Sequence, residues 1–305
     1  EIAARAHVEK IEFIIKKAVQ ESKLNFSDIN GISATAGPGL IVCLTVGLNA
    51  GKAIAGTLKK PFIAVNHLEG HALSPKINHK IEFPYLLLLI SGGHTQFLEV
   101  NGVNNYRRIG TTIDDALGEA FDKTAKLLGI EFPGGPKIEE WAKKGDENYF
   151  KLPKPILKKG GCNLSFAGLK TAVLRTTKKI KNQKEKFHLA ASFQKTINEI
   201  LYEKTRLAME EFLKDKKNSE KVFVIAGGVA ANLKIRKNLT KLSKEKKFSP
   251  IFPPINLCGD NAAMIAWAGI ERYKINLIDN LEFPSKARWP LDSSAPFLKG
   301  PGLKI

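Results

Sequence analysis

The segment from Tyr85 to His94 reads Tyr-Leu-Leu-Leu-Leu-Ile-Ser-Gly-Gly-His, an apolar run that ends in a Gly-Gly turn. Such a run predicts a short, buried β-strand. Glycines directly after a strand let the backbone approach a ligand closely and point its N–H groups at phosphate oxygens. The segment therefore predicts a buried strand that ends at a candidate phosphate-binding turn.

A second apolar run ends in the same way. Val222–Ala226 predicts another buried strand, and Gly227-Gly228 follows it directly. A third Gly-Gly pair, in the motif Pro133–Pro136, follows a predicted helix. Glycine turns after two buried strands resemble the phosphate-binding loops of two-lobed nucleotide-binding folds, although simple hairpin turns explain the same residues.

Helical and strand-like segments alternate around these turns. Near the start, apolar residues at helical spacing predict an amphipathic helix, and predicted strands at 29–36 and 62–65 flank a predicted helix over 40–58. Further along the chain, residues 115–128 and 262–273 also predict helices. The alternation of strands and helices predicts an α/β fold.

The predicted elements divide the chain into two lobes. We expect a first lobe over residues 1–82 and a second over residues 83–305. Residues 137–218 are lysine-rich and predict a helical insertion in the second lobe. The Pro/Gly-rich tail after residue 291 is expected to be loose.

Composition narrows the function classes. Hydrophobic residues make up 43% of the chain, yet no unbroken apolar run reaches the roughly 18 residues of a membrane-spanning helix, so we expect no membrane association. The three cysteines are far apart in the sequence and match no zinc or redox spacing, which favours a reducing compartment such as the cytoplasm. A mitochondrial location stays open, because any targeting segment would lie outside this sequence.

A formal charge of +18 and a pI near 9.7 suit a partner that carries phosphates, such as a nucleic acid. Most of the 48 basic residues are scattered lysines, however, and a lysine-rich proteome would give the same charge. Charge alone therefore leaves the nucleic-acid hypothesis open.

Two histidines have the spacing of metal ligands. His67 and His71 lie four residues apart, so a helix would place both imidazoles on one face. Leu68 follows the first histidine, where the zincin motif requires Glu. Asp260, just before a predicted helix, is the best third ligand, and two histidines with one carboxylate would leave metal positions open for substrate. Solvated histidines and a helix-capping carboxylate are the alternatives.

Two further polar residues are ambiguous from the sequence. Asp122 lies on the polar side of a predicted helix, where it is a surface carboxylate or a ligand for a ribose or an amine. Asn232 closes the segment that begins at Gly227, where it caps the next helix or hydrogen-bonds a ligand.

Nine motifs in order resemble the TsaD family, the tRNA N6-adenosine threonylcarbamoyltransferases, formerly described as O-sialoglycoprotein endopeptidases. The similarity runs from Ile2 to about Leu291. The motifs are Ala3–His7, Gly37–Leu40, His67–His71, Ser91–Thr95, Asp114–Lys126, Pro133–Pro136, Ser165–Thr171, Gly227–Asn232 and Asp260–Gly269.

The resemblance implies a two-lobed actin/sugar-kinase/Hsp70-like fold with an active site in the cleft between the lobes. It implies one Fe²⁺ or Zn²⁺ ion bound by His67, His71 and Asp260. It also implies transfer of threonylcarbamoyl from threonylcarbamoyl-AMP to N6 of adenosine 37 in ANN-decoding tRNAs. The residues that would hold the adenylate are Leu89, Ile90, Ser91, Gly92, Gly93, Asp122, Gly135 and Asn232. No residue stands out as a general base.

The implied partners are tRNA with either a paralogous scaffold subunit and a small ATPase, or a second copy of the chain in an organelle. Family members begin with a strand-turn-strand that is absent before Glu1. We therefore expect the chain alone to be poorly stable or inactive. The alternatives are a non-catalytic scaffold paralogue, an inactive fragment and a two-lobed kinase or ATPase, which has no need of the histidine pair. A metallopeptidase lacks support because the zincin motif is missing.

Overall fold

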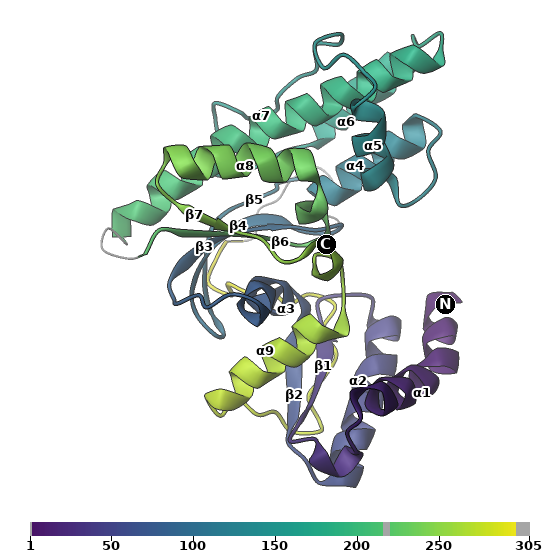
Figure 1. The fold of residues 1–305 in the computed structure, drawn as a ribbon, viewed down its shortest axis with the longest axis vertical. Helices are drawn as coiled ribbons and strands as arrows, with labels where there is room; N and C mark the ends of the chain where they lie inside the picture. Colours follow the sequence, from purple (N-terminus) through teal and green to yellow (C-terminus); the bar gives the residue numbers. More distant parts are fainter. Residues whose placement is uncertain (1, 216–219, 297–305) are drawn as a thin grey trace. The chain divides into compact units, whose positions relative to one another are not determined.

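The computed structural model describes residues 2–215 and 220–296. The chain forms two compact units (Figure 1). Of the described residues, unit 1 comprises 2–79, 103–105 and 261–293, and unit 2 comprises 80–102, 106–215, 220–260 and 294–296.

Unit 1 is built on two parallel strands, β1 (Ile32–Gly37) and β2 (Phe62–Asn66). The strands are joined by α2 (Ile41–Leu58), and α1 (Ile2–Ser22) packs on α2. Two further helices, α3 (His67–Leu73) and α9 (Ala262–Lys274), pack on each other. Short 3₁₀ turns η1 (Phe26–Asp28) and η2 (Ser74–Ile77) complete the unit.

Two glycines let helices approach both faces of β1. A Cβ at Gly51 in α2 would lie 2.9 Å from the Cβ of Ala34, and one at Gly269 in α9 would lie 2.6 Å from the Cβ of Ser33. Successive strand residues point to opposite faces, so α2 and α9 cover opposite sides of the strand. Figure 1 shows this sandwich of two helices around β1 and β2.

Helix α2 is also apolar enough and long enough to cross a membrane by length and composition alone. Leu48, Gly51 and Ala55 on this helix are buried within unit 1. Apolar helices that pack on a sheet meet the same criterion, so this observation is weak support for a membrane span.

Unit 2 contains a five-stranded sheet in the order β5-β4-β3-β6-β7. The strands are β3 (Tyr85–Ile90), β4 (Thr95–Gly102), β5 (Asn105–Thr111), β6 (Val222–Ala226) and β7 (Ser249–Ile251). Strand β3 pairs antiparallel with β4 and parallel with β6, which in turn pairs parallel with β7. Every residue of β3 and β6 is buried, which confirms both buried strands predicted from the sequence.

Helices fill the rest of unit 2. They are α4 (Leu117–Leu127), α5 (Gly134–Ala142), α6 (Ala167–Thr177), α7 (Gln183–Asp215) and α8 (Leu233–Glu245), with 3₁₀ turns η3 (Gly228–Ala231) and η4 (Ile255–Leu257). Figure 1 shows α7 and α8 side by side over the sheet. Phe193 and Ile197 of α7 share one core with Leu88 of β3 and Ile225 of β6. The long α7 therefore covers the strands that end in the Gly-Gly turns.

The observed division differs from the predicted lobes in two respects, the smaller being that Val103–Asn105 belongs to unit 1. The first stretch of unit 1 ends at His79, close to the predicted boundary at residue 82, but residues 261–293 return to unit 1. They do so because α9 packs on β1, β2 and α3. Residues 137–218 contain most of α5 and all of α6 and α7, while the predicted tail after residue 291 runs largely outside the described residues.

Candidate functional site

The two histidines lie on α3, directly after β2. Asn66 ends the buried strand and caps the helix, because its side-chain oxygen accepts a hydrogen bond from the Leu68 N–H at 2.9 Å. The Asn66 side-chain amide also donates to the Trp289 carbonyl at 2.9 Å. This fixed start places His67 half-buried and His71 fully buried on one helix face, with ring centroids 4.9 Å apart.

Close packing of α3 and α9 brings the third candidate ligand to the histidines. A Cβ at Gly70 would lie 2.9 Å from Cδ1 of Ile265, so a larger residue there would have to displace the Ile265 side chain. Asn261 caps α9 by accepting a hydrogen bond from the Met264 N–H at 2.9 Å. Asp260 precedes this cap directly, so the start of α9 delivers its carboxylate to α3.

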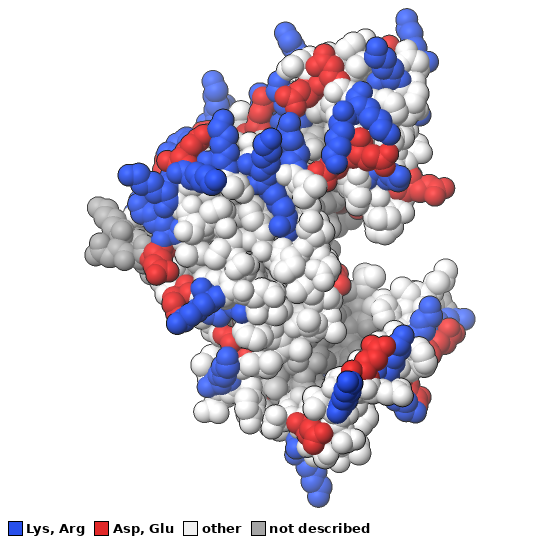
Figure 2. All heavy atoms as spheres, viewed as in Figure 1, with Lys and Arg blue, Asp and Glu red and all other residues white. Residues whose placement is uncertain are grey.

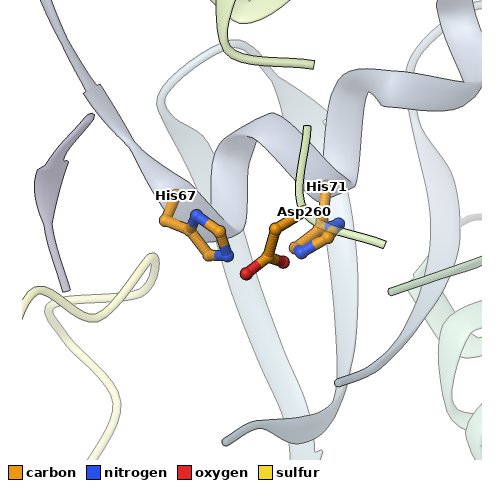
Figure 3. A group of neighbouring side chains, drawn as sticks. All are labelled: His67, His71 and Asp260. Carbon is orange, nitrogen blue, oxygen red and sulfur yellow. The ribbon is translucent and has the colours of Figure 1, made fainter. Parts of the chain in front are cut away.

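Candidate ligand atoms of His67, His71 and Asp260 all lie within 4.8 Å of one another. Figure 3 shows the two imidazole rings and the carboxylate turned toward one another. Ligands around a tetrahedral ion at about 2.1 Å lie about 3.4 Å apart, so small side-chain movements would close the set. Two imidazoles and a carboxylate are suitable donors for iron or zinc. The residues present therefore fit the implied metal, and the structure brings the predicted trio together.

The predicted phosphate-binding turns lie at one edge of the unit 2 sheet. Ser91–His94 forms the hairpin turn between β3 and β4, with the Ser91 N–H donating to the His94 carbonyl at 2.8 Å. Gly227-Gly228 follows β6, the parallel neighbour of β3. Carboxyl ends of parallel neighbours meet at the same sheet edge, where open α/β sheets bind ligands. Ser91–His94 is therefore a hairpin turn, as one alternative from the sequence had it. It also lies at the same sheet edge as Gly227-Gly228, where a ligand could bind.

The glycines of these turns differ in what they contact. Gly227 has φ +97°, and a Cβ there would lie 2.4 Å from the Ile90 carbonyl oxygen, so the backbone itself requires glycine. A Cβ at Gly92, Gly93 or Gly228 would meet nothing within 4 Å. Protein packing does not explain these three glycines, and their open surroundings leave room for a ligand. Leu89 and Ile90 are fully buried in β3, so only their backbone is at the sheet edge.

Asp122 links α4 to the next glycine motif. Its Oδ1 accepts a hydrogen bond from the Gly134 N–H at 2.9 Å, which satisfies a free donor at the start of α5. Gly134 and Gly135 form the first turn of α5 rather than a separate loop. Asp122, Gly134 and Gly92 line one hollow of about 470 Å³, whereas Gly135 is outside its lining.

Asn232 is the N-cap of α8. Its Oδ1 accepts the Ile235 N–H at 3.0 Å, and its amide donates to Oε1 of Gln194 at 3.3 Å. Both side chains are buried. Asn232 therefore caps α8, and its amide additionally joins α8 to α7.

An ion-pair cluster that was not predicted from the sequence lies beside the first Gly-Gly turn. Asp115 is buried and pairs with Lys170 at 2.7 Å and Lys123 at 3.3 Å. Burial alone would raise the pKa of Asp115, but hydrogen bonds and charges from Lys170 and Lys123 outweigh it and lower that pKa below its usual value. Gly118 of α4 donates its N–H to the Ser91 carbonyl at 3.2 Å. The cluster thus fixes the start of α4, which contacts the turn. In the sequence, the adjacent acidic residues at 114 and 115 were the only signal of this cluster.

Comparisons with known proteins decide the family. The family model described as tRNA N6-adenosine threonylcarbamoyltransferase (TsaD) matches residues 1–267. A protein of that name from Pelagibacter ubique is 66% identical over all of this chain and 85% of its own length. Proteins of the same name from Zymomonas mobilis and Rhodospirillum rubrum are 52% and 48% identical, over 100% and 99% of this chain and 83% and 84% of their own lengths. The chain belongs to this family.

Solved structures support the fold class of this threonylcarbamoyltransferase family member. A full-length HypF in a phosphate- and nucleotide-bound form has a TM-score of 0.63 at 14% identity, over 87% of this chain and 42% of HypF. A second HypF, from T. kodakarensis, has a TM-score of 0.61 at 15% identity, over 86% of this chain and 43% of that protein. Identities this low concern the fold alone, and the predicted two-lobed, kinase-like α/β class is confirmed.

Proposed function

We propose that the chain transfers the threonylcarbamoyl group from threonylcarbamoyl-AMP to N6 of adenosine 37 in tRNAs that read ANN codons. Family membership supports the tRNA transferase activity. The observation that carries the proposal at the level of residues is the convergence of His67, His71 and Asp260 within 4.8 Å. A kinase or ATPase has no need of this trio, and a scaffold that had lost activity would not be expected to retain it.

The residues of unit 2 suit the adenylate half of the donor. Backbone N–H groups at Gly92, Gly93 and Gly228 would receive the phosphate, since no side chain fills the space around their Cα atoms. Asp122 lines the adjacent hollow and is proposed to hold the ribose. The reaction forms a bond from N6 to the carbamoyl carbon and breaks the bond from that carbon to the phosphate oxygen, while N6 loses one proton and AMP leaves.

His67, His71 and Asp260 would hold one iron or zinc ion. Bound there, the ion would supply Lewis-acid polarisation of the carbamoyl carbonyl and a fixed place for the threonylcarbamoyl group. Burial of His71 and the α3–α9 packing keep the donor side chains in place before substrate arrives.

The partners and compartment are part of the proposal. A paralogous scaffold subunit and a small ATPase, or a second copy of the chain, would assemble with it. A cytoplasmic location is supported by Cys162 and Cys258, which are buried free thiols of the kind expected in a reducing compartment.

The test compares metal content and tRNA modification in the wild-type chain, His67→Ala and a matched control, His79→Ala, which removes an exposed histidine outside the trio. Metal is measured by plasma mass spectrometry, and modified adenosine by nucleoside mass spectrometry after incubation with threonylcarbamoyl-AMP, with any required partner proteins added. We expect about one ion per chain and modified tRNA for the wild type and the control, and neither for His67→Ala. A metal-free His67→Ala that still modifies tRNA would contradict the metal role. The function would be contradicted if neither this chain nor a version extended to the full length of its relatives modifies tRNA.

A further inference from the structure

Helix α8 presents one row of lysines to solvent. Lys234, Lys237, Lys241 and Lys244 are three or four residues apart, so they lie on one face of the helix, and all four are exposed. The opposite face is anchored in the core by Ile235, Leu239 and Leu242. We call these four residues the α8 lysine row.

The charges of the α8 lysine row are weakly neutralised. Lys234 lies 3.4 Å from Glu147, and Lys241 lies 3.9 Å from Glu245 with 74% of its side chain exposed. Within residues 2–215 and 220–296, the side chains of Lys237 and Lys244 form no ion pair or hydrogen bond. Four lysines on one helix face with carboxylate partners for two of them repel one another, and a bound anion would relieve that repulsion.

The row begins beside Asn232, the N-cap of α8. Lys234 follows the α8 cap Asn232 by two positions, and Gln194, which hydrogen-bonds Asn232, lines a hollow of about 460 Å³. The charged residues of this hollow are Lys143, Lys195, Lys234 and Lys237 together with Glu139, Asp146 and Glu147. A second hollow of about 490 Å³ continues along the helix between Lys234 and Lys244. Figure 2 shows many basic side chains, with acidic ones among them, over the region of α7 and α8. The charge is therefore mixed near Asn232, and lysines are the charged residues that line the hollow along α8.

The length and chemistry of the row suit a polynucleotide. Ten residues of helix separate Lys234 from Lys244, about 15 Å at the helical rise of about 1.5 Å per residue. A strand of duplex nucleic acid carries one phosphate about every 3.4 Å of axis, so the row spans about four phosphates. Lysines are flexible point charges that contact phosphates without reading bases. A folded acidic protein has no comparable regular spacing of charge.

We propose that the α8 lysine row binds the phosphodiester backbone of the RNA substrate, which then leads away from Asn232 along the helix. The inference rests on the proposed function, since that function makes tRNA the substrate. It places the RNA contact along the exposed face of α8.

The experiment measures binding of an unmodified tRNA transcript by fluorescence anisotropy. The test variant is Lys237→Gln/Lys241→Gln/Lys244→Gln, and the matched control is Lys178→Gln/Lys179→Gln/Lys181→Gln, three exposed lysines beyond the end of α6. Binding is measured from about 50 to about 200 mM salt, where loss of three phosphate contacts lowers the slope of log affinity against log salt by about two to three. We expect that reduced slope and about tenfold weaker binding at low salt in the test variant, with near-wild-type values in the control.

Three outcomes would overturn the proposal. The first is a test variant with the wild-type slope and affinity, and the second is a control variant that loses as much affinity as the test variant. The third is displacement of tRNA by poly-glutamate as readily as by RNA, which would indicate a general anion-binding surface. Each leaves the transferase function intact if the wild-type chain modifies tRNA, whereas failure of the wild type to bind tRNA at all would contradict both. Unchanged unfolding midpoints and AMP binding in both variants confirm that only the surface has changed.

Discussion

Glu69 and Arg272 form a buried ion pair, with 2.8 Å between Glu69 Oε2 and Arg272 Nη1 and side chains that are 1% and 7% exposed. Glu69 lies on α3 between the two candidate metal ligands, and Arg272 lies on α9, whose cap follows Asp260. The other carboxylate oxygen of Glu69 accepts a hydrogen bond from the Asn104 N–H at 2.8 Å. The pair therefore fixes the helix that carries two ligands to the helix that delivers the third.

Replacing Arg272 by Met should destabilise the chain by about 3–5 kcal/mol, because the Glu69 charge would stay buried without its guanidinium. Misplacement of α3 against α9 should also weaken metal binding. Urea unfolding in metal-free buffer measures the first effect, and titration with Zn²⁺ measures the second.

Lys274→Met is the matched control for Arg272→Met, since Lys274 lies on the same helix and its side chain is 60% exposed in its pair with Glu271. It should change the free energy of unfolding by about 0–1 kcal/mol. The double variant Glu69→Gln/Arg272→Met should recover part of the loss, because no unpaired charge remains buried. Equal effects of the Arg272 and Lys274 substitutions would rule out the anchoring role.

Removing the metal should lower stability in a way that depends on the trio. An ion at about 100 times its Kd raises the free energy of unfolding by about 2.7 kcal/mol, and a chelator should abolish that increment. Asp260→Asn should unfold at the same urea concentration with and without added ion, because the carboxylate that would bind the ion is lost. The substitution should not change the stability of the metal-free chain, because Asp260 is exposed and no cavity forms. His79→Ala should keep the increment; its loss there would mean that the ion binds elsewhere.

The two glycines after β6 should respond differently to substitution by alanine. Gly227→Ala should cost about 2 kcal/mol or more, because φ is positive and the new Cβ would clash with the Ile90 carbonyl oxygen. Gly228→Ala should leave stability within about 0.5 kcal/mol, since its Cβ meets no atom within 4 Å.

If the turn binds the adenylate phosphate, Gly228→Ala should nevertheless weaken AMP binding, because the methyl group enters the space left for the ligand. Calorimetric titration with AMP measures this, and Gly92→Ala serves as an independent check on the neighbouring turn. Wild-type AMP affinity in both variants would argue against phosphate binding at this sheet edge.

The parts of the fold that could be predicted are those with strong local patterns. Six apolar residues in a row identified β3, and the helix expected over 40–58 matches α2 at 41–58. Strand β5 escaped notice because its sequence, from Asn105 to Thr111, is polar and only partly buried at the edge of the sheet. The return of α9 to unit 1 was also missed, since nothing local indicates that Gly269 packs against Ser33.

In the candidate site, too, local patterns could be predicted and contacts between distant residues could not. His67, His71 and Asp260 could be selected from spacing and from the family resemblance, and the structure brings them together. The pairing of Glu69 with Arg272 joins residues 203 positions apart, and no spacing rule reaches that far. Asp115 was overlooked for a related reason, because its importance depends on Lys170 and Lys123 converging on it in space.

Asp115 should stabilise the chain at neutral pH but not in acid. Its pKa is lowered in the folded state, so its contribution is fully present above the unfolded pKa of about 3.9 and is lost as pH falls through the folded value. Asp115→Asn should therefore cost about 1–2 kcal/mol at pH 7 and progressively less below about pH 4. Urea unfolding across this range tests it, with Glu21→Gln, an exposed carboxylate, as the control that should show no effect. A difference that persists unchanged in acid would assign the effect to packing.

Substitutions at Asn232 should distinguish its role as a helix cap from a role in ligand binding. Asn232→Ala should cost about 1 kcal/mol, because the Ile235 N–H loses its acceptor, whereas Asn232→Ser should restore most of that loss. Serine cannot replace the amide that donates to Gln194 beside the lysine-lined hollow. If the Asn232 amide also binds the adenylate, Asn232→Ser will recover the unfolding free energy without recovering AMP affinity in calorimetry. Recovery of both by serine would show that Asn232 acts only as the cap of α8, and the adenylate would then have to be held by the glycine turns and Asp122.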